Sequence, residues 1–161
     1  MAAMSTPRAA FTLLEICLTL AIGVVLMLLA VPSVAGLLAE QRLHESYERF
    51  QKFADNARAH SLREQQPYTL VWQRHGIALV GVERDAHGEP VVVDQMGFDK
   101  DEVFDLERPA ALAKKPAAEW TFWPSGVCEP AIVSYKGPSG HWRVSFSALT
   151  SRGTFIQSEA L

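Results

Sequence analysis

A single carboxylate, Glu15, lies near the start of a long apolar stretch that runs from Phe11 to Ala39. No Lys, Arg or His occurs within this stretch, so the glutamate has no cation of its own segment to pair with. A charged side chain in apolar surroundings is costly when it stands alone and is tolerated when it meets an opposite charge. The chemistry that these residues suggest is therefore charge pairing with a group from outside the stretch.

The apolar stretch has the length of a membrane-spanning helix. No charged residue occurs from residue 16 to residue 39, and as a helix this part is about 36 Å long. The hydrocarbon core of a bilayer is about 30 Å thick, whereas a cleaved secretory signal has an apolar core of only about 7 to 15 residues. Two interpretations fit: a plain membrane anchor, which leaves Glu15 unexplained, and a segment whose processing gives Glu15 a partner.

The second interpretation depends on a cut between Ala10 and Phe11. Residues 1–10 read as a short hydrophilic leader, and its removal makes Phe11 the new amino terminus. The new ammonium group would lie one helical turn from Glu15, on the same face. Glu15 then neutralises either its own terminus or that of a neighbouring subunit, and only the second arrangement builds a polymer.

The segment R-A-A-F-T-L-L-E-I, followed by the long apolar run, resembles the processing motif of type IV pilins and of the pseudopilins of type II secretion systems. By this resemblance, cleavage falls between Ala10 and Phe11, and the new amine of Phe11 is methylated. The family usually has glycine before the cut, where this chain has alanine. The residues that the resemblance assigns to assembly are Glu15, Thr12, Leu13, Leu14 and Pro32, the last being the family's helix-bending proline.

The resemblance also implies partners and a location. The partners are other pilin or pseudopilin subunits, a prepilin peptidase that also methylates, the inner-membrane assembly platform and membrane lipid. Arg8 and the initial amine should keep the amino end in the cytoplasm of a bacterium, so that the rest of the single-pass chain lies in the periplasm until it enters a fibre. No cofactor is expected, and the net charge of −3 argues against a nucleic-acid partner, which needs an excess of Lys and Arg.

The remaining sequence predicts an α+β fold. From residue 40 to residue 63 apolar side chains recur at steps of three and four, which predicts an amphipathic helix that continues the transmembrane and assembly helix at 11–39. From residue 64 to residue 161 the pattern changes to short β-rich segments bounded by Gly, Pro or Ser, typical of a periplasmic globular domain of mostly antiparallel sheet. The helix should bury Phe50, Phe53 and Ala57 against this sheet, in the arrangement of a pilin.

The resemblance therefore implies a structural subunit that is processed by prepilin peptidase and assembled into a short pseudopilus for protein export by type II secretion. The segment W-T-F-W-P-S-G at residues 120–126 further resembles the distal region of H-type minor pseudopilins. Two alternatives stay open. One is a minor pilin of a type IV pilus, which serves adhesion, motility or DNA uptake, and the other is an uncleaved single-pass anchor for a periplasmic binding domain.

The acidic stretch at residues 94–107 is the one candidate for a metal site. Oxygen-rich loops hold calcium, and some major pseudopilins bind it in their globular domain. The EF-hand pattern fails, because Val103 and Phe104 stand where an oxygen ligand and a glycine should be, so a solvated charged loop is the favoured interpretation. The candidate calcium ligands are Asp99, Asp101, Glu102 and Asp105.

No enzymatic activity is expected from the sequence. The five histidines show no ligand spacing, and no nucleophile elbow or phosphate loop occurs.

Overall fold

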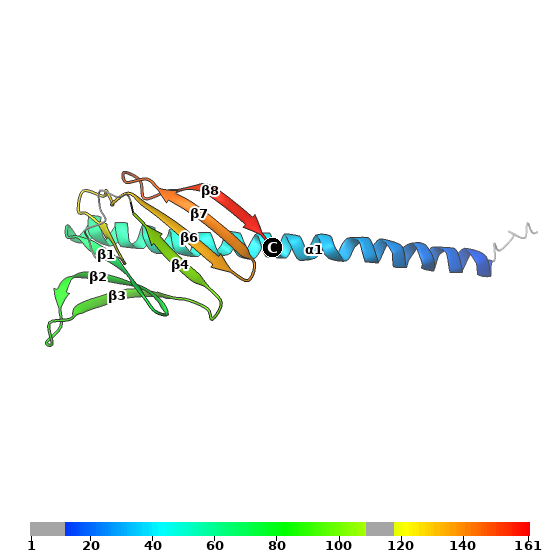
Figure 1. Cartoon of the computed structure of the whole chain (residues 1–161), viewed down its shortest axis with the longest axis horizontal. Coiled ribbons are helices and arrows are strands. Elements are labelled where there is room, and N and C mark those ends of the chain that lie inside the picture. Colours follow the sequence, from blue (N-terminus) through cyan, green and yellow to red (C-terminus); the bar gives the residue numbers. More distant parts are fainter. Residues whose placement is uncertain (1–11, 109–117) are drawn as a thin grey trace, which may run out of the picture. The chain divides into compact units, whose positions relative to one another are not determined.

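The computed structural model describes residues 12–108 and 118–161, with the side chains of residues 28–35 left aside. The chain divides into two compact units, residues 1–38 and residues 39–161, and each is described by itself. We call the described residues 12–38 the N-terminal segment and residues 39–161 the globular domain. Helix α1 spans Leu13–Glu64 and contributes to both units (Figure 1).

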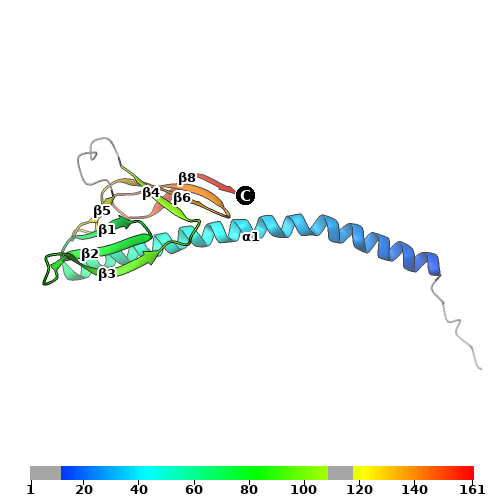
Figure 2. The same cartoon turned by 60° about the horizontal axis from the view of Figure 1, so that its bottom comes forward.

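The described part of the globular domain contains two four-stranded sheets. Their strand orders are β3-β2-β1-β5 and β4-β6-β7-β8, and all neighbouring strands are antiparallel. Both sheets pack against the domain part of α1 (Figures 1 and 2). The predicted α+β class, a long helix on antiparallel strands, is confirmed. The strands are β1 (Tyr68–Gln73), β2 (Gly76–Arg84), β3 (Pro90–Gly97), β4 (Val103–Glu107), β5 (Glu119–Phe122), β6 (Ala131–Gly137), β7 (Gly140–Phe146) and β8 (Gly153–Ala160).

Strand β4 corrects the expectation that the whole acidic stretch at 94–107 is a solvated loop. Within it, Phe104 is buried and Leu106 is half-buried against the core, whereas the residues between and beside them are more exposed. This alternation of period two is that of a strand with one face on a core. Phe104 lies opposite Tyr135 of β6. The acidic residues of the stretch are poor strand formers, and they mask an alternation that tertiary packing enforces.

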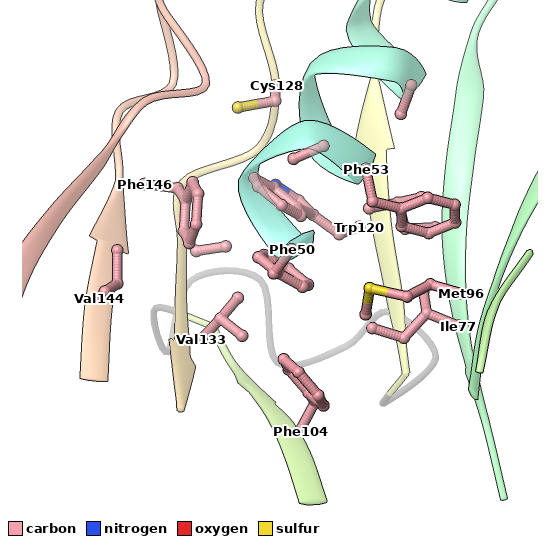
Figure 3. Packing of buried hydrophobic residues seen from close by; sticks show 14 of the residues in the cluster. Phe50, Phe53, Ile77, Met96, Phe104, Trp120, Cys128, Val133, Val144 and Phe146 are labelled. Atoms are coloured by element: carbon pink, nitrogen blue, oxygen red, sulfur yellow. The ribbon is translucent and has the colours of Figure 1, made fainter. Parts of the chain in front are cut away.

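Phe50 of α1 lies at the centre of the core, between the two sheets (Figure 3). Its ring centroid lies 6.3 Å from that of Trp120 on β5 and 5.5 Å from that of Phe146 on β7, so it packs with aromatic residues of both sheets. Ala54 and Ala57 lie on the same face of the helix and are fully buried, as the helical spacing predicts. The two sheets therefore share one core through α1.

The buried tryptophans each have a partner for the indole N–H. Trp120 Nε1 donates to the carbonyl oxygen of Glu129 at 2.7 Å. Trp142 Nε1 donates to the hydroxyl of Ser46 on α1 at 2.8 Å, and that hydroxyl donates in turn to the carbonyl oxygen of Leu43 at 2.6 Å. Because an unsatisfied buried donor costs about 1–3 kcal/mol, the bond from Trp142 to Ser46 helps to fix how α1 lies on the second sheet.

Candidate assembly site

Helix α1 begins with a capping residue, Thr12. The backbone N–H of Glu15 donates to Thr12 Oγ1 at 3.3 Å and to the Thr12 carbonyl oxygen at 3.0 Å. Threonine at the N-cap with glutamate three residues later is the sequence pattern of a capping box, and a carboxylate in the first turn also interacts favourably with the helix dipole. Glu15 therefore has a local role at the start of the helix, which the T-x-x-E spacing could have revealed and the sequence analysis missed.

The N-terminal segment presents its apolar side chains to the surroundings. The large apolar residues from Leu13 to Met27 are between 50% and 83% exposed. Leu13 and Leu14, two of the predicted assembly residues, are among the most exposed of them. An exposed apolar surface of this extent marks a site of contact with lipid or with another chain.

Several residues of the predicted site lie outside the part of the chain that the structure describes. Ala10 and Phe11, which flank the predicted cleavage site, are outside the described residues, and so is the side chain of Pro32, whose backbone belongs to α1. Among the residues that the structure does describe, no helix is both long and apolar enough to cross a membrane.

Glu102, a candidate calcium ligand, is turned inward and clamped by the domain itself. Its side chain is 9% exposed, and Oε2 accepts hydrogen bonds from Arg49 Nη2 at 2.5 Å and from the backbone N–H of Asp99 at 3.1 Å. Oε1 accepts a bond from the hydroxyl of Tyr135 at 3.1 Å. The Arg49 guanidinium also lies 5.9 Å from the ring centroid of Phe104, within cation–π range. This clamp joins α1, the turn after β3, and β6.

The electrostatics of the clamp keep Glu102 ionised. Burial acts to raise the pKa of the Glu102 carboxyl, but the hydrogen bonds from the Asp99 backbone and from Arg49 outweigh burial, and the pKa lies below its ordinary value. Burial is also the main cause that raises the pKa of Tyr135 to about 12, and the charge of Glu102 adds to it. The phenol therefore stays protonated and donates to a carboxylate at neutral pH.

The four candidate calcium ligands do not converge. Asp99 and Asp101 are exposed on the turn before β4, where they line a groove of about 440 Å³ together with Arg42 of α1. Asp105 lies on β4 and lines a different hollow. Within residues 12–108 and 118–161, no group of three or more His, Cys, Asp or Glu residues is arranged to hold a metal ion.

A second polar cluster closes the turn between α1 and β1. The Glu64 carboxylate accepts a hydrogen bond from the Tyr68 hydroxyl, and it lies 2.9 Å from His60 Nδ1 and 3.0 Å from Arg63 Nη2. The bond from Tyr68 is the main cause that lowers the pKa of Glu64 from 4.5 to about 2, followed by the bonds to His60 and Arg63. This cluster fixes the direction in which the chain leaves the helix.

Arg58 was not identified from the sequence, yet it ties two loops to α1. Its Nε donates to the carbonyl oxygen of Gly126 at 2.8 Å, and its terminal nitrogens donate to those of Thr150 at 3.1 Å and Leu149 at 3.3 Å. The three acceptors come from segments 68 to 92 residues further along the chain. No local sequence pattern signals such a long-range contact.

Comparison with solved structures places this architecture among pilin-like folds. One similar structure is the minor pseudopilin EpsH from the type 2 secretion system of Vibrio cholerae, with a TM-score of 0.51, 16% identity, and coverage of 73% of this chain and 95% of that chain. Another is the type IV minor pilin FimU of Pseudomonas aeruginosa, with a TM-score of 0.55, 14% identity, and coverage of 76% of this chain and 94% of that chain. No protein-family model matches the chain, and no curated protein matches it in sequence. The fold is thus that of pilins and pseudopilins.

Proposed function

We propose that the chain is a structural, non-enzymatic subunit of a type II secretion pseudopilus. Prepilin peptidase removes residues 1–10, the amine of Phe11 is methylated, and the subunit leaves the inner membrane for a short fibre. The observation that carries the proposal is that one chain contains both a pilin-like domain and a helical segment whose apolar side chains are exposed. A helix surface of this kind needs cover from lipid before assembly and from other subunits afterwards.

Glu15 sets the register of assembly in this proposal. Its carboxylate pairs with the terminal amine of Phe11 on a neighbouring subunit, because two opposite charges in apolar surroundings are tolerated together and costly apart. The capping role of the T-x-x-E segment explains how Glu15 is held at the first turn of α1. The pairing role explains why a charged residue stands at the edge of an apolar run.

Three variants of the full chain in its native membrane separate capping from pairing. Glu15→Gln keeps a side chain that suits a capping box and loses the charge, so it should insert normally but fail to enter fibres. Glu15→Ala should fail in the same way, whereas Thr12→Ala removes the cap hydroxyl, keeps the charge and should still assemble. Recovery of sheared fibres measures assembly. Fibres of Glu15→Gln at the parent's yield would show that charge pairing is wrong.

A minor pilin of a type IV pilus is the second candidate, because the similarity to FimU is as close as that to EpsH. The two functions differ in what is lost with the gene. Deletion in the source bacterium should abolish export of secreted enzymes if the pseudopilus role holds, and it should abolish adhesion, motility or DNA uptake if the pilus role holds. A chain that keeps its leader and tolerates Glu15→Ala would instead be a plain membrane anchor.

A further inference from the structure

We infer that neighbouring copies of this chain contact each other side by side through two edge strands, β3 of one copy and β8 of the next. The inference rests on the proposed function, since it concerns copies held in one fibre. It adds a contact between globular domains to the helix contact made through Glu15. The argument uses exposure, strand direction and charge within the globular domain alone.

The two edges expose apolar side chains. Strand β3 ends the first sheet and strand β8 ends the second. Val91, Val92 and Val93 are exposed on β3, as are Phe155 and Ile156 on β8. Long edge strands in monomers are usually protected by lysine, by proline or by their shortness. The other two edges, β4 and β5, have five and four residues, whereas β3 and β8 each have eight and carry no lysine. The one proline on these two strands, Pro90, is the first residue of β3 and lies before the exposed valines.

Both edge strands run antiparallel to α1. On β3, Val91 lines a hollow with Glu64, and the later Asp94 accepts a hydrogen bond from Asn56 at 2.7 Å, so the strand runs back along the helix. On β8, the N–H of Gly153 donates to Gln51 at 3.1 Å, and Ser158 is at the level of Leu43. Copies in which the domain parts of α1 are parallel, as in one fibre, therefore present β3 and β8 as parallel neighbours.

The two edges lie on opposite flanks of the globular domain (Figures 1 and 2). A contact between them joins different surfaces of the two copies, and such a heterologous contact continues from copy to copy instead of closing into a dimer. Val91 lies at the level of Glu64, and the ring of Phe155 lies 4.6 Å from that of Tyr47. Apposing these two residues offsets the two copies by about 25 Å along α1, at about 1.5 Å per residue. Pairing of Glu15 with Phe11 of another copy requires an offset of only about 6 Å, so the strand contact joins each copy to a different neighbour from the one reached through Glu15.

A parallel alignment of the two strands places apolar side chains of one strand beside apolar side chains of the other. When Val91 lies beside Phe155, Val92 lies beside Ile156, so apolar residues meet on both faces of the strands. The same alignment places Glu89, which precedes β3, one position out of register with Arg152, which precedes β8, within reach of its long side chain, and both residues are exposed. Opposite charges thus meet at the entry to the contact, which favours this register over shifted ones.

Bulges make the contact selective. The pairing of β2 with β3 shifts register around Val80, and the pairing of β7 with β8 shifts between Arg143 and Val144, opposite the exposed apolar residues. A bulge interrupts the regular ladder and disfavours unselective strand addition. The inferred contact therefore depends on packing of the valines against Phe155 and Ile156 more than on a regular ladder of backbone hydrogen bonds.

Cysteine cross-linking of the full chain in cells of the source bacterium that assemble fibres tests the inference, in a Cys17→Ser background that leaves only the buried Cys128. Copies with Val92→Cys and copies with Ile156→Cys, distinguished by tags of different mass, are produced together and treated with a short bifunctional maleimide. A mixed dimer is expected. Val103→Cys on β4 replaces Ile156→Cys as the matched control, since both native side chains are 51% exposed, and no dimer is expected from it. Equal dimer yields from both pairs, or a dimer of Val92→Cys with itself, would overturn the inference.

A charge exchange sharpens the test. Glu89→Arg in the Val92→Cys copy should lower the mixed-dimer yield several-fold, and adding Arg152→Glu to the Ile156→Cys copy should restore it. Failure to restore the yield contradicts the proposed register. The same samples report the mature amino terminus and the fibre yield. Processed, fibre-forming chains without the mixed dimer refute this inference and leave the proposed function standing, whereas chains that keep residues 1–10 and form no fibre refute both.

Discussion

The N-terminal segment and the globular domain use α1 in opposite ways. In the globular domain the helix buries its apolar face against its own chain, with Phe50, Ala54 and Ala57 fully covered. In the N-terminal segment the large apolar side chains from Leu13 to Met27 remain at least half exposed. The described part of this chain leaves the apolar side chains of the first part uncovered, whereas it covers those of the second part. Substitutions in the two parts should therefore change different quantities, assembly in one and folding in the other.

Phe50→Ala should have the largest effect on folding. Removing the ring that joins both sheets should lower the free energy of unfolding by about 3–5 kcal/mol, because the transfer term and the cavity term add. Denaturant unfolding of the full chain in mild detergent, followed by tryptophan fluorescence, measures the change. A loss below about 1 kcal/mol would contradict the view that the two sheets share one core through this residue.

Glu102→Gln should have an intermediate effect on the globular domain. Arg49 and Tyr135 would lose a charged acceptor, and the expected loss is about 1–2 kcal/mol, since Arg49 is partly solvated. The same unfolding measurement applies. The exposed neighbour Asp101 provides a matched control, because Asp101→Asn should change stability by less than about 0.5 kcal/mol. Equal effects of the two variants would show that the clamp contributes nothing.

Glu64→Gln should reveal a pH-dependent contribution at the end of α1. The folded-state pKa of Glu64 is lowered to about 2 from 4.5, so its stabilisation is fully present above about 4.5 and is lost as the pH falls toward about 2. The difference in unfolding midpoint between the parent and the variant should therefore be constant from pH 7 to about 5 and shrink below that. A difference that persists unchanged at pH 2 would rule out this account of the cluster.

Leu20→Ala in the N-terminal segment should have the smallest effect on folding. Leu20 is exposed, so the free energy of unfolding of the globular domain should change by no more than about 0.5 kcal/mol. The fibre yield of the same variant should fall, because the side chain packs against other subunits in the proposed assembly. A large loss of domain stability would erase the distinction between the two parts of the helix.

The parts of the fold that follow from local periodicity were predictable, and the parts that depend on distant contacts were not. The spacing of Phe50, Ala54 and Ala57 and the alternation in most strands point directly to the α+β class. Strand β4 was missed because its acidic residues resemble a loop, while the buried Phe104 holds it in the second sheet. The T-x-x-E capping pattern at Thr12 is local as well, so the start of α1 was also predictable from the sequence.

The candidate site shows the same limit. Arg49 and Glu102 lie 53 residues apart in sequence, and nothing local to either of them predicts the bond between them. Without that bond, Glu102 reads as one of four clustered carboxylates and so as a metal ligand. The structure distributes those carboxylates between an internal clamp, an exposed turn and a strand, which composition alone does not distinguish.

The mature amino terminus of the chain, recovered from its native membrane, tests the central claim most directly. Mass spectrometry of the intact chain should find residues 1–10 removed and a methylated Phe11 at the start. That result would supply the ammonium group that the proposed pairing of Glu15 requires, and it would separate an assembling subunit from a plain anchor. A chain that still carries residues 1–10 in the assembled or membrane-bound form would contradict the account.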